Sequence, residues 1–328
     1  MQLPSDKYLA GFLDGDGSLT LAQGKYLWLE MYQKQSRDGV IELARQVLFP
    51  QGRLHTKVGY RRGTRTVATR LNITGQKAVD QACRLKPYLV AKRARLNRFL
   101  CELGFTERVG TDSTPVHPSR KWLAGYFDAD GCIAACVAHG GGSASLTFSI
   151  DADIVEQAGL ELVQKAYGGR IYLRGAKGAR WEMNADAAGA KAFLTPFAKH
   201  LILKREQAYF VLGCAAMGHF RDGRIITDTL KAMKTRPHRL SDLTAEVDVT
   251  SYLAQVRNLQ PEPGRRYRHM DGQVCSSCGA ERLYAKGLCN RCWQNARYSS
   301  SRSKRKSESA TVQAGNNLRS PLIPPSSP

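Results

Sequence analysis

A nine-residue segment occurs twice in this chain of 328 residues, as LAGFLDGDG at residues 9–17 and as LAGYFDADG at residues 123–131. The acidic positions are identical in the two copies, whereas the apolar positions differ. Repetition inside one chain predicts two copies of one structural unit. This feature constrains the fold more than any other in the sequence.

The repeat continues well beyond the nonapeptide. Lys92 lies 76 residues after Asp16, and Lys204 lies 74 residues after Asp130. Between these landmarks each copy has segments in which polar and apolar residues alternate, as in strands with one buried face. A helix, a proline-marked break and a second helix then follow. The unit is predicted to be an α+β half-domain whose antiparallel sheet has helices on one face and water on the other.

The expected strands carry polar residues on the open face of each sheet. They cover residues 26–33, 52–58 and about 70–73 in the first copy, and residues 145–150, 169–174 and about 180–184 in the second. Alternation predicts that the inward face of residues 52–58 and 169–174 is half-buried. The residues expected on that inward face are Leu54, Thr56, Val58, Ile171 and Leu173.

The composition indicates a folded protein that binds a polyanion. Hydrophobic residues make up 42% of the chain, and the formal net charge is +21 with a pI of about 9.8. Residues 261–328 account for +8, which leaves +13 for residues 1–260. Because Lys and Arg neutralise phosphates, nucleic acid is the leading partner. No apolar run reaches the roughly 18 residues that span a bilayer, and no secretory signal begins the chain, so we expect an intracellular protein that uses no membrane.

The two nonapeptides are expected to be helices that pack against each other. The Ala-Gly pair in each copy lets two otherwise apolar helices approach closely. Each helix is expected to stop at Gly17 or Gly131, with that glycine in a left-handed conformation. Packing of this kind would bring Asp16 and Asp130 together.

Two carboxylates at two negative helix ends are unfavourable unless cations lie between them. Oxygen ligands favour Mg²⁺, and two or more such ions could activate water and stabilise the leaving oxygen in phosphodiester hydrolysis. From matching positions, Lys92 and Lys204 could polarise the water or neutralise phosphoryl charge. The expected Mg²⁺ ligands are Asp16, Asp130, Gly15 and Ala129.

The paired motifs, the repeat spacing and the matching lysines resemble the double-motif LAGLIDADG homing endonucleases, over about residues 5–260. The resemblance implies a monomer of two pseudo-symmetric αββαββα half-domains that form a DNA-binding saddle. It also implies hydrolysis of both strands of a long double-stranded site, with short 3′ overhangs, to start the copying of an intron or intein gene. The catalytic residues that it implies are Asp16, Asp130, Lys92, Lys204 and Gln33, the glutamine that ends the second strand.

The second copy departs from this pattern. The position that matches Gln33 is Ala152, which lies between Asp151 and Asp153. Either the two DNA strands are cut at unequal rates, or the second copy uses one of those aspartates. The inner acids of the motifs, Asp14 and Asp128, are interpreted as structural residues that hold the helices rather than as metal ligands.

The open faces of the two sheets are expected to read an asymmetric DNA site through the major groove. The first half would use Trp28, Glu30, Tyr32, Arg53, His55, Lys57, Arg61, Arg62, Arg65, Arg70 and Asn72. The second would use Arg170, Tyr172, Arg174, Lys177, Arg180, Glu182 and Asn184. A basic loop and helix over residues 233–259 would place Lys234, Arg236, His238 and Arg239 on phosphates. The alternative interpretation, which the sequence supports equally, is a surface helix preceded by a basic segment.

Four cysteines form a separate motif near the C-terminus. Cys275, Cys278, Cys289 and Cys292 are spaced C-x₂-C-x₁₀-C-x₂-C, which predicts one tetrahedral structural Zn²⁺ in a small module that extends the DNA footprint. The predicted domains are a first half-domain (1–105), a linker (106–120), a second half-domain with its C-terminal helix (121–260), the zinc module (261–298) and a disordered basic, Ser- and Pro-rich tail (299–328).

Two further functions remain open on the same scaffold. One is a maturase that acts on intron RNA, and the other is a DNA-binding regulator that has lost cleavage. Retention of both outer aspartates and both lysines favours catalysis, because a protein that only binds DNA need not tolerate such clustered charge.

Overall fold

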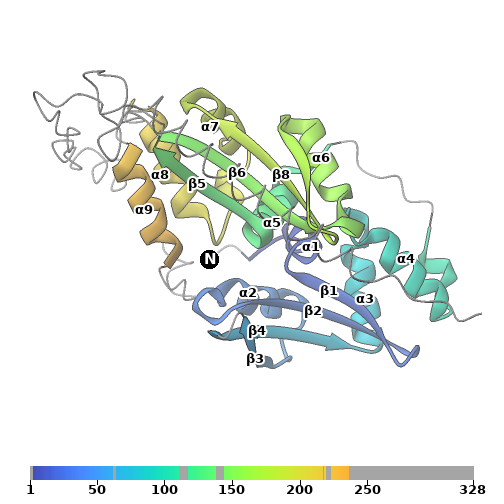
Figure 1. Cartoon of the computed structure of the whole chain (residues 1–328). Coiled ribbons are helices and arrows are strands. Elements are labelled where there is room, and N and C mark those ends of the chain that lie inside the picture. Colours follow the sequence, from blue (N-terminus) through green and yellow to red (C-terminus); the bar gives the residue numbers. More distant parts are fainter. Residues whose placement is uncertain are drawn as a thin grey trace, which may run out of the picture. The chain divides into compact units, whose positions relative to one another are not determined.

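The computed structural model describes residues 3–61, 64–110, 117–137, 144–216, 218 and 223–235 (Figure 1). The chain divides into two compact units, Met1–Pro261 and Glu262–Pro328, and the whole of the second lies outside the described residues. The four cysteines, Arg62, Arg236, His238 and Arg239 also lie outside them. No helix in the described part of the chain is long and apolar enough to cross a bilayer.

The first half of the repeat begins with helix α1 (Asp6–Asp14) and contains one sheet. Its strands are β1 (Gly17–Ala22), β2 (Tyr26–Lys34), β3 (Leu54–Arg61) and β4 (Thr64–Thr74), and its further helices are α2 (Gly39–Leu48), α3 (Gln76–Leu85) and α4 (Arg93–Glu102). The sheet is antiparallel with the order β1-β2-β4-β3.

The second half repeats this order of elements. Helix α5 (Arg120–Asp130) is followed by β5 (Gly131–Val137), β6 (Ala144–Asp153), α6 (Ala158–Tyr167), β7 (Arg170–Arg174), β8 (Gly178–Ala185), α7 (Ala187–Leu194), α8 (Arg205–Ala216) and α9 (Gly223–Thr235). Its sheet is antiparallel with the order β5-β6-β8-β7, which matches the first sheet strand for strand. The predicted α+β repeat is therefore confirmed.

Alternation along the central strands separates a buried face from an open one. In β2, Leu27, Leu29 and Met31 are buried, whereas Trp28 and Tyr32 are exposed. The pattern holds for β4 and β8, whose outward residues are Arg70, Asn72, Arg180, Glu182 and Asn184. Helices cover the inner face of each sheet, so the polar residues are left on the outer face.

The expectation for the two outermost strands was partly wrong. Leu54 and Ile171 are half-buried, but Val58 is 47% exposed and Leu173 is 66% exposed, and Thr56 is exposed as well. Strands β3 and β7 each pair on one side only, at the edge of their sheets. An edge strand has a neighbouring strand on one side only, which leaves its side chains less covered than those of a central strand.

Helices α1 and α5 lie side by side where the two halves meet (Figure 1). A Cβ added to Gly11 would lie 2.0 Å from the carbonyl oxygen of Trp122, and one added to Gly125 would lie 2.0 Å from that of Tyr8. Only glycine permits this approach of backbone to backbone, as the small residues of the motif predicted. The two helices also share an N-terminal arrangement, since Ser5 and Ser119 cap the main-chain N–H groups of Tyr8 and Trp122.

The predicted left-handed glycines at the helix ends are not observed. Helix α1 ends at Asp14 with Gly15 as its C-cap, and Gly131 has φ −73° and ψ 157°, which is an extended conformation. Gly17 and Gly131 instead begin strands directly against the preceding helical turn. A Cβ at these positions would lie 2.5 Å from the carbonyl oxygen of Leu13 and 2.3 Å from that of Phe127. Close approach, rather than a positive φ, requires glycine there.

Candidate active site

The inner acids of the motifs are buried and fully engaged by main-chain donors. The Asp14 carboxylate accepts hydrogen bonds from the N–H groups of Val90 (2.8 Å) and Lys92 (2.9 Å). The Asp128 carboxylate accepts equivalent bonds from Ile202 (2.6 Å), Leu203 (3.1 Å) and Lys204 (2.8 Å). Each acid thus fixes the segment that carries the basic residue of its own half, so the structural interpretation of both inner acids fits their contacts.

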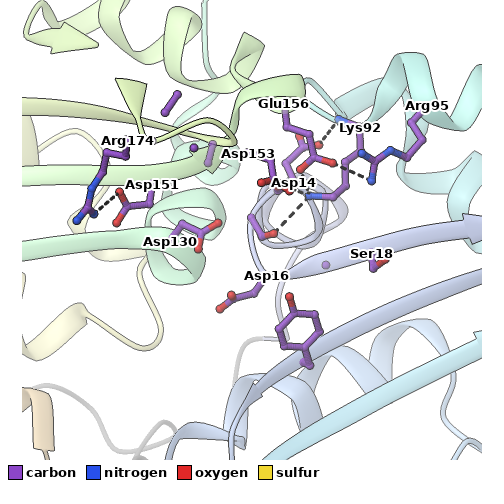
Figure 2. Close-up of a pocket in the computed structure, with 17 residues that line it drawn as sticks. Asp14, Asp16, Ser18, Lys92, Arg95, Asp130, Asp151, Asp153, Glu156 and Arg174 are labelled. Carbon is purple, nitrogen blue, oxygen red and sulfur yellow. Dashed lines mark hydrogen bonds and ion pairs between the residues drawn. The ribbon is translucent and has the colours of Figure 1, made fainter. Parts of the chain in front are cut away.

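The outer acids, Asp16 and Asp130, line one cavity of about 810 Å³ between the two halves (Figure 2). Removal from water, reinforced by the charge of Asp130, raises the pKa of Asp16 to about 8. Removal from water also raises the pKa of Asp130 to about 6, against the opposing effects of Lys92 and Lys204. The two carboxyl groups therefore face one cavity, as the spacing of the motifs predicts, and negative charge on both is unfavourable without a cation.

The two outer acids have different neighbours. Gln33 Nε2 donates to Asp16 at 2.7 Å. In the second half, Gly131 pairs with Ile150 as Gly17 pairs with Met31, which places Ala152 at the Gln33 position. No side-chain amide can take that role at Ala152.

Of the two aspartates beside Ala152, Asp151 is already paired. Its carboxylate accepts from Arg180 at 2.6 and 2.7 Å and from Arg174 at 3.1 Å, and the bonds from Arg180 are the main reason that its pKa is lowered. Asp153 is exposed and lines the same cavity.

Both lysines of the repeat are buried at the ends of the motif helices. Lys92 Nζ donates to the carbonyl oxygens of Asp14 (2.6 Å) and Gly15 (3.3 Å). Lys204 Nζ donates to the carbonyl oxygen of Asp128. Burial lowers the pKa of Lys204, although nearby acids, Asp128 foremost, oppose the shift.

The donors in the cavity fit a hard divalent cation. Two carboxylates with raised pKa values face the same space, and Gly15 also lines it, whereas Ala129 is not among the lining residues. In the described ranges, no group of three or more His, Cys, Asp or Glu side chains is arranged to hold a metal ion. Mg²⁺ commonly binds through one or two carboxylates and completes its ligand shell with water and substrate phosphates.

Neither a protein-family model nor a curated protein sequence matches the chain. Among solved structures, the chain is similar to the LAGLIDADG meganuclease I-AabMI bound to uncleaved DNA, with 15% identity, a TM-score of 0.50, and coverage of 70% of this chain and 98% of that one. It is also similar to the LAGLIDADG homing endonuclease I-GzeII in complex with its DNA target, with 12% identity, a TM-score of 0.51, and coverage of 72% and 99%. The chain has the LAGLIDADG homing endonuclease fold.

The LAGLIDADG fold places most of the predicted DNA-reading residues on the outer faces of the sheets. Tyr32 pairs with Arg70, which pairs in turn with His55, so three strands contribute neighbouring side chains. Exposed positions in the predicted set are Trp28, Tyr32, Arg53, His55, Lys57, Arg170, Tyr172, Arg174, Lys177 and Asn184. Arg61 and Arg65 lie in strands, but their side chains are not in the described part.

Two outer-face acids and one predicted phosphate contact have protein partners. Glu30 forms an ion pair with Arg70 at 2.8 Å, and Glu182 lies 4.0 Å from Arg180. Lys234, near the end of α9, donates to Cys132 Sγ at 3.1 Å.

Three charged residues near the lysines were missed by sequence reasoning. Glu156 pairs with Lys92 and Arg95, and Arg37 lies close enough to Lys204 to lower the pKa of that lysine. Arg37 and Glu156 each end the short turn that follows the second strand of their sheet, at Gln35–Arg37 and Ile154–Glu156. The sequence did contain a signal for two of them, because Arg37 and Glu156 carry opposite charges at matched positions of the repeat.

Proposed function

We propose that this protein is a site-specific DNA endonuclease that requires a divalent cation and hydrolyses both strands of a long, asymmetric double-stranded site as a monomer, leaving short 3′ overhangs. The observation that carries the proposal is the meeting of Asp16 and Asp130 in one cavity at the ends of two packed helices. The two similar solved structures, those of I-AabMI and I-GzeII, are bound to DNA, which supports the proposal.

Asp16 and Asp130 would hold Mg²⁺, with the carbonyl oxygen of Gly15 nearby. When bound, the cation would supply an activated water and charge stabilisation for phosphodiester hydrolysis. Gln33, which donates to Asp16 at 2.7 Å, would orient that carboxylate. Lys92 and Lys204, held by main-chain carbonyls at the helix ends, would place positive charge beside the reacting phosphates.

The outer faces of both sheets would bind the major groove. The net charge of +13 over residues 1–260 supports phosphate binding along the duplex. Because the polar residues on β4 and β8 differ, the two half-sites should differ in sequence.

The four cysteines support a separate zinc module at residues 261–298, joined to the second half-domain and followed by a tail at 299–328. Thiolates at this spacing favour one structural Zn²⁺ and would exclude Mg²⁺. The module would lengthen the contact with DNA, and such an enzyme would act inside a cell, beside its DNA target.

The decisive experiment is incubation of the full chain with a randomised plasmid library in Mg²⁺, followed by sequencing of the cut ends. We expect double-strand cuts at one long site. Asp16→Asn and Asp130→Asn should abolish double-strand cleavage and leave binding in Ca²⁺ largely intact. Wild-type cleavage by either variant would refute the metal assignment, and tight binding without any cut would favour a regulator or an RNA maturase.

A further inference from the structure

The repeat places opposite charges at one pair of matched positions beside the candidate active site. Arg37 lies four residues after Gln33, and Glu156 lies four residues after Ala152. Since Gln33 and Ala152 occupy the same position in the two sheets, Arg37 and Glu156 also correspond. The two halves therefore differ in charge at a position that faces the lysines.

Glu156 connects the second half to the basic residues of the first. Its Oε2 lies 2.8 Å from Lys92 Nζ, and its Oε1 lies 2.9 Å from Arg95 Nη1 (Figure 2). Glu156 is 8% exposed and Lys92 is 2% exposed. An ion pair removed from water to this extent is only weakly screened, so the charge of Lys92 is largely compensated by Glu156.

The matched position in the other half has the opposite arrangement. Lys204 corresponds to Lys92 and has no ion pair among those of the described residues; Asp128 and Asp16 lie near it, and so does the positive charge of Arg37. The guanidinium of Arg37 donates to the carbonyl oxygen of Lys234, at the end of α9. Gln207, which corresponds to Arg95, is buried and uncharged.

We group these residues into two centres, one around each outer acid and each built from both halves. The first centre consists of Asp16, Gln33, Arg37 and Lys204. The second consists of Asp130, Ala152, Glu156 and Lys92. The grouping follows the bond from Gln33 to Asp16 in the first centre and the ion pair of Glu156 with Lys92 in the second.

A phosphate gains negative charge at its leaving oxygen as the bond to that oxygen breaks, so an uncompensated cation accelerates the step. In the first centre the matched position carries Arg37, whose positive charge adds to that of Lys204. In the second centre Lys92 is bound to Glu156, whose own charge repels the phosphate. We propose that Glu156 is a positioning residue that restrains Lys92, so that the second centre cuts its DNA strand more slowly and the enzyme passes through a nicked intermediate.

This inference rests on the proposed endonuclease function, and strand-resolved kinetics test both. The substrate is the site recovered from the plasmid library, with a different fluorophore on the 5′ end of each strand, cut in Mg²⁺ under single-turnover conditions. For the wild type we expect rate constants that differ by about tenfold or more, equivalent to about 1.4 kcal/mol in activation free energy.

Three variants separate the role of Glu156 from that of Ala152. Glu156→Gln should accelerate the slow strand and leave the fast strand unchanged. Arg37→Glu should slow the fast strand, and the double variant Arg37→Glu/Glu156→Arg should reverse the order of cutting. Glu42→Gln is the matched control, because Glu42 pairs with Arg45 at 2.5 Å on α2, outside the cavity, and should change neither rate.

Thermal melting and DNA affinity in Ca²⁺ establish that each variant is folded. Equal rates for the two strands in the wild type would overturn this inference but leave the proposed function standing. Two other results would show that Glu156 has only a structural role and would also overturn the inference. One is equal slowing of both strands by Glu156→Gln, and the other is an unchanged order of strand cutting in the double variant. If neither strand were cut at any site while binding was retained, the proposed function would fail together with the inference.

Discussion

The indole Nε1 of Trp122 in α5 donates a hydrogen bond of 2.9 Å to the carboxylate of Asp14 in α1. Tyr8, at the matched position of α1, makes the reciprocal bond, because its hydroxyl donates to the carboxylate of Asp128 in α5 at 2.7 Å. Each half therefore supplies a donor to the buried acid of the other half. Because Asp14 and Asp128 also hold the segments that carry Lys92 and Lys204, these two bonds tie the packing of the helices to the position of the lysines.

The first prediction concerns these two donors. Trp122→Phe and Tyr8→Phe should each reduce the free energy of unfolding by about 1–3 kcal/mol, because a buried carboxylate loses one of its hydrogen bonds. Urea denaturation followed by circular dichroism measures the change. Tyr26→Phe is the control, since Tyr26 is 53% exposed and should change stability by less than about 0.5 kcal/mol. A loss from Tyr8→Phe no larger than that of the control would show that the hydroxyl bond does not stabilise the pair of halves.

The second prediction concerns the contact between the helices. Gly11→Ala should cost about 3 kcal/mol or more, because the new methyl group would meet the main chain of α5, which has no rotamer by which to move away. Soluble yield and thermal melting would report it. Gly59→Ala is the matched control, since its nearest atom would lie at an ordinary 3.4 Å. An equal effect of the two substitutions would contradict the close approach of α1 and α5.

Those features of the fold that depend on local sequence were predictable. The repeat located Asp16 and Asp130, because a motif that recurs in a matching context must occupy matching positions in a pseudo-symmetric structure. The role of Gln33 followed from the resemblance, in which a glutamine ends the second strand. In the structure Gln33 lies beside Asp16, to whose carboxylate its Nε2 donates.

The features that were missed depend on contacts between distant residues. Exposure of Val58 and Leu173 follows from the order of strands in each sheet, which alternation along one strand does not reveal. The conformation of Gly17 depends on a strand that starts directly against the preceding helix. The Lys92 and Glu156 pair joins residues from different halves, and only a comparison of the turns after Gln33 and Ala152 would have indicated it.

The third prediction concerns pH. Asp16 and Asp130 have pKa values of about 8 and about 6 in the fold, above the usual value of about 3.9 for Asp. The folded state therefore binds more protons than the unfolded state, and the stabilisation present below about pH 4 is lost as the pH rises through these values. In EDTA, the wild type should lose melting temperature relative to Asp16→Asn between about pH 5 and pH 8.5.

Calcium should offset this loss. Protons compete with a cation for the two carboxylates, so Ca²⁺ should raise the melting temperature more at about pH 8 than at about pH 5.5, and should do so less in Asp16→Asn. A difference between wild type and variant that did not change with pH would contradict the raised pKa values. A calcium effect of equal size in both proteins would contradict cation binding at Asp16.

The fourth prediction concerns the outer face of the first sheet. Glu30→Gln would release Arg70 from its ion pair and remove a negative charge from the surface that would meet DNA. The affinity for DNA of any sequence should rise, and the slope of log affinity against log salt concentration should steepen by about 1. Titration of a random-sequence duplex at several salt concentrations measures both. Glu42→Gln, which frees Arg45 on α2 instead, should leave the slope unchanged; an equal change in both variants would argue against DNA binding on this face.

The fifth prediction concerns the four cysteines, which lie outside the described residues. Cys275→Ser would remove one thiolate ligand, and a segment this short folds only with its metal. The protein should therefore lose its one equivalent of zinc, and affinity for the full site should fall more than the rate of cleavage once DNA is bound. Zinc content by elemental analysis and single-turnover rates at saturating protein separate the two effects. Cys101→Ser, at an exposed free thiol in the first half, is the control. Unchanged zinc content and affinity in Cys275→Ser would exclude both the metal site and its contribution to the DNA footprint.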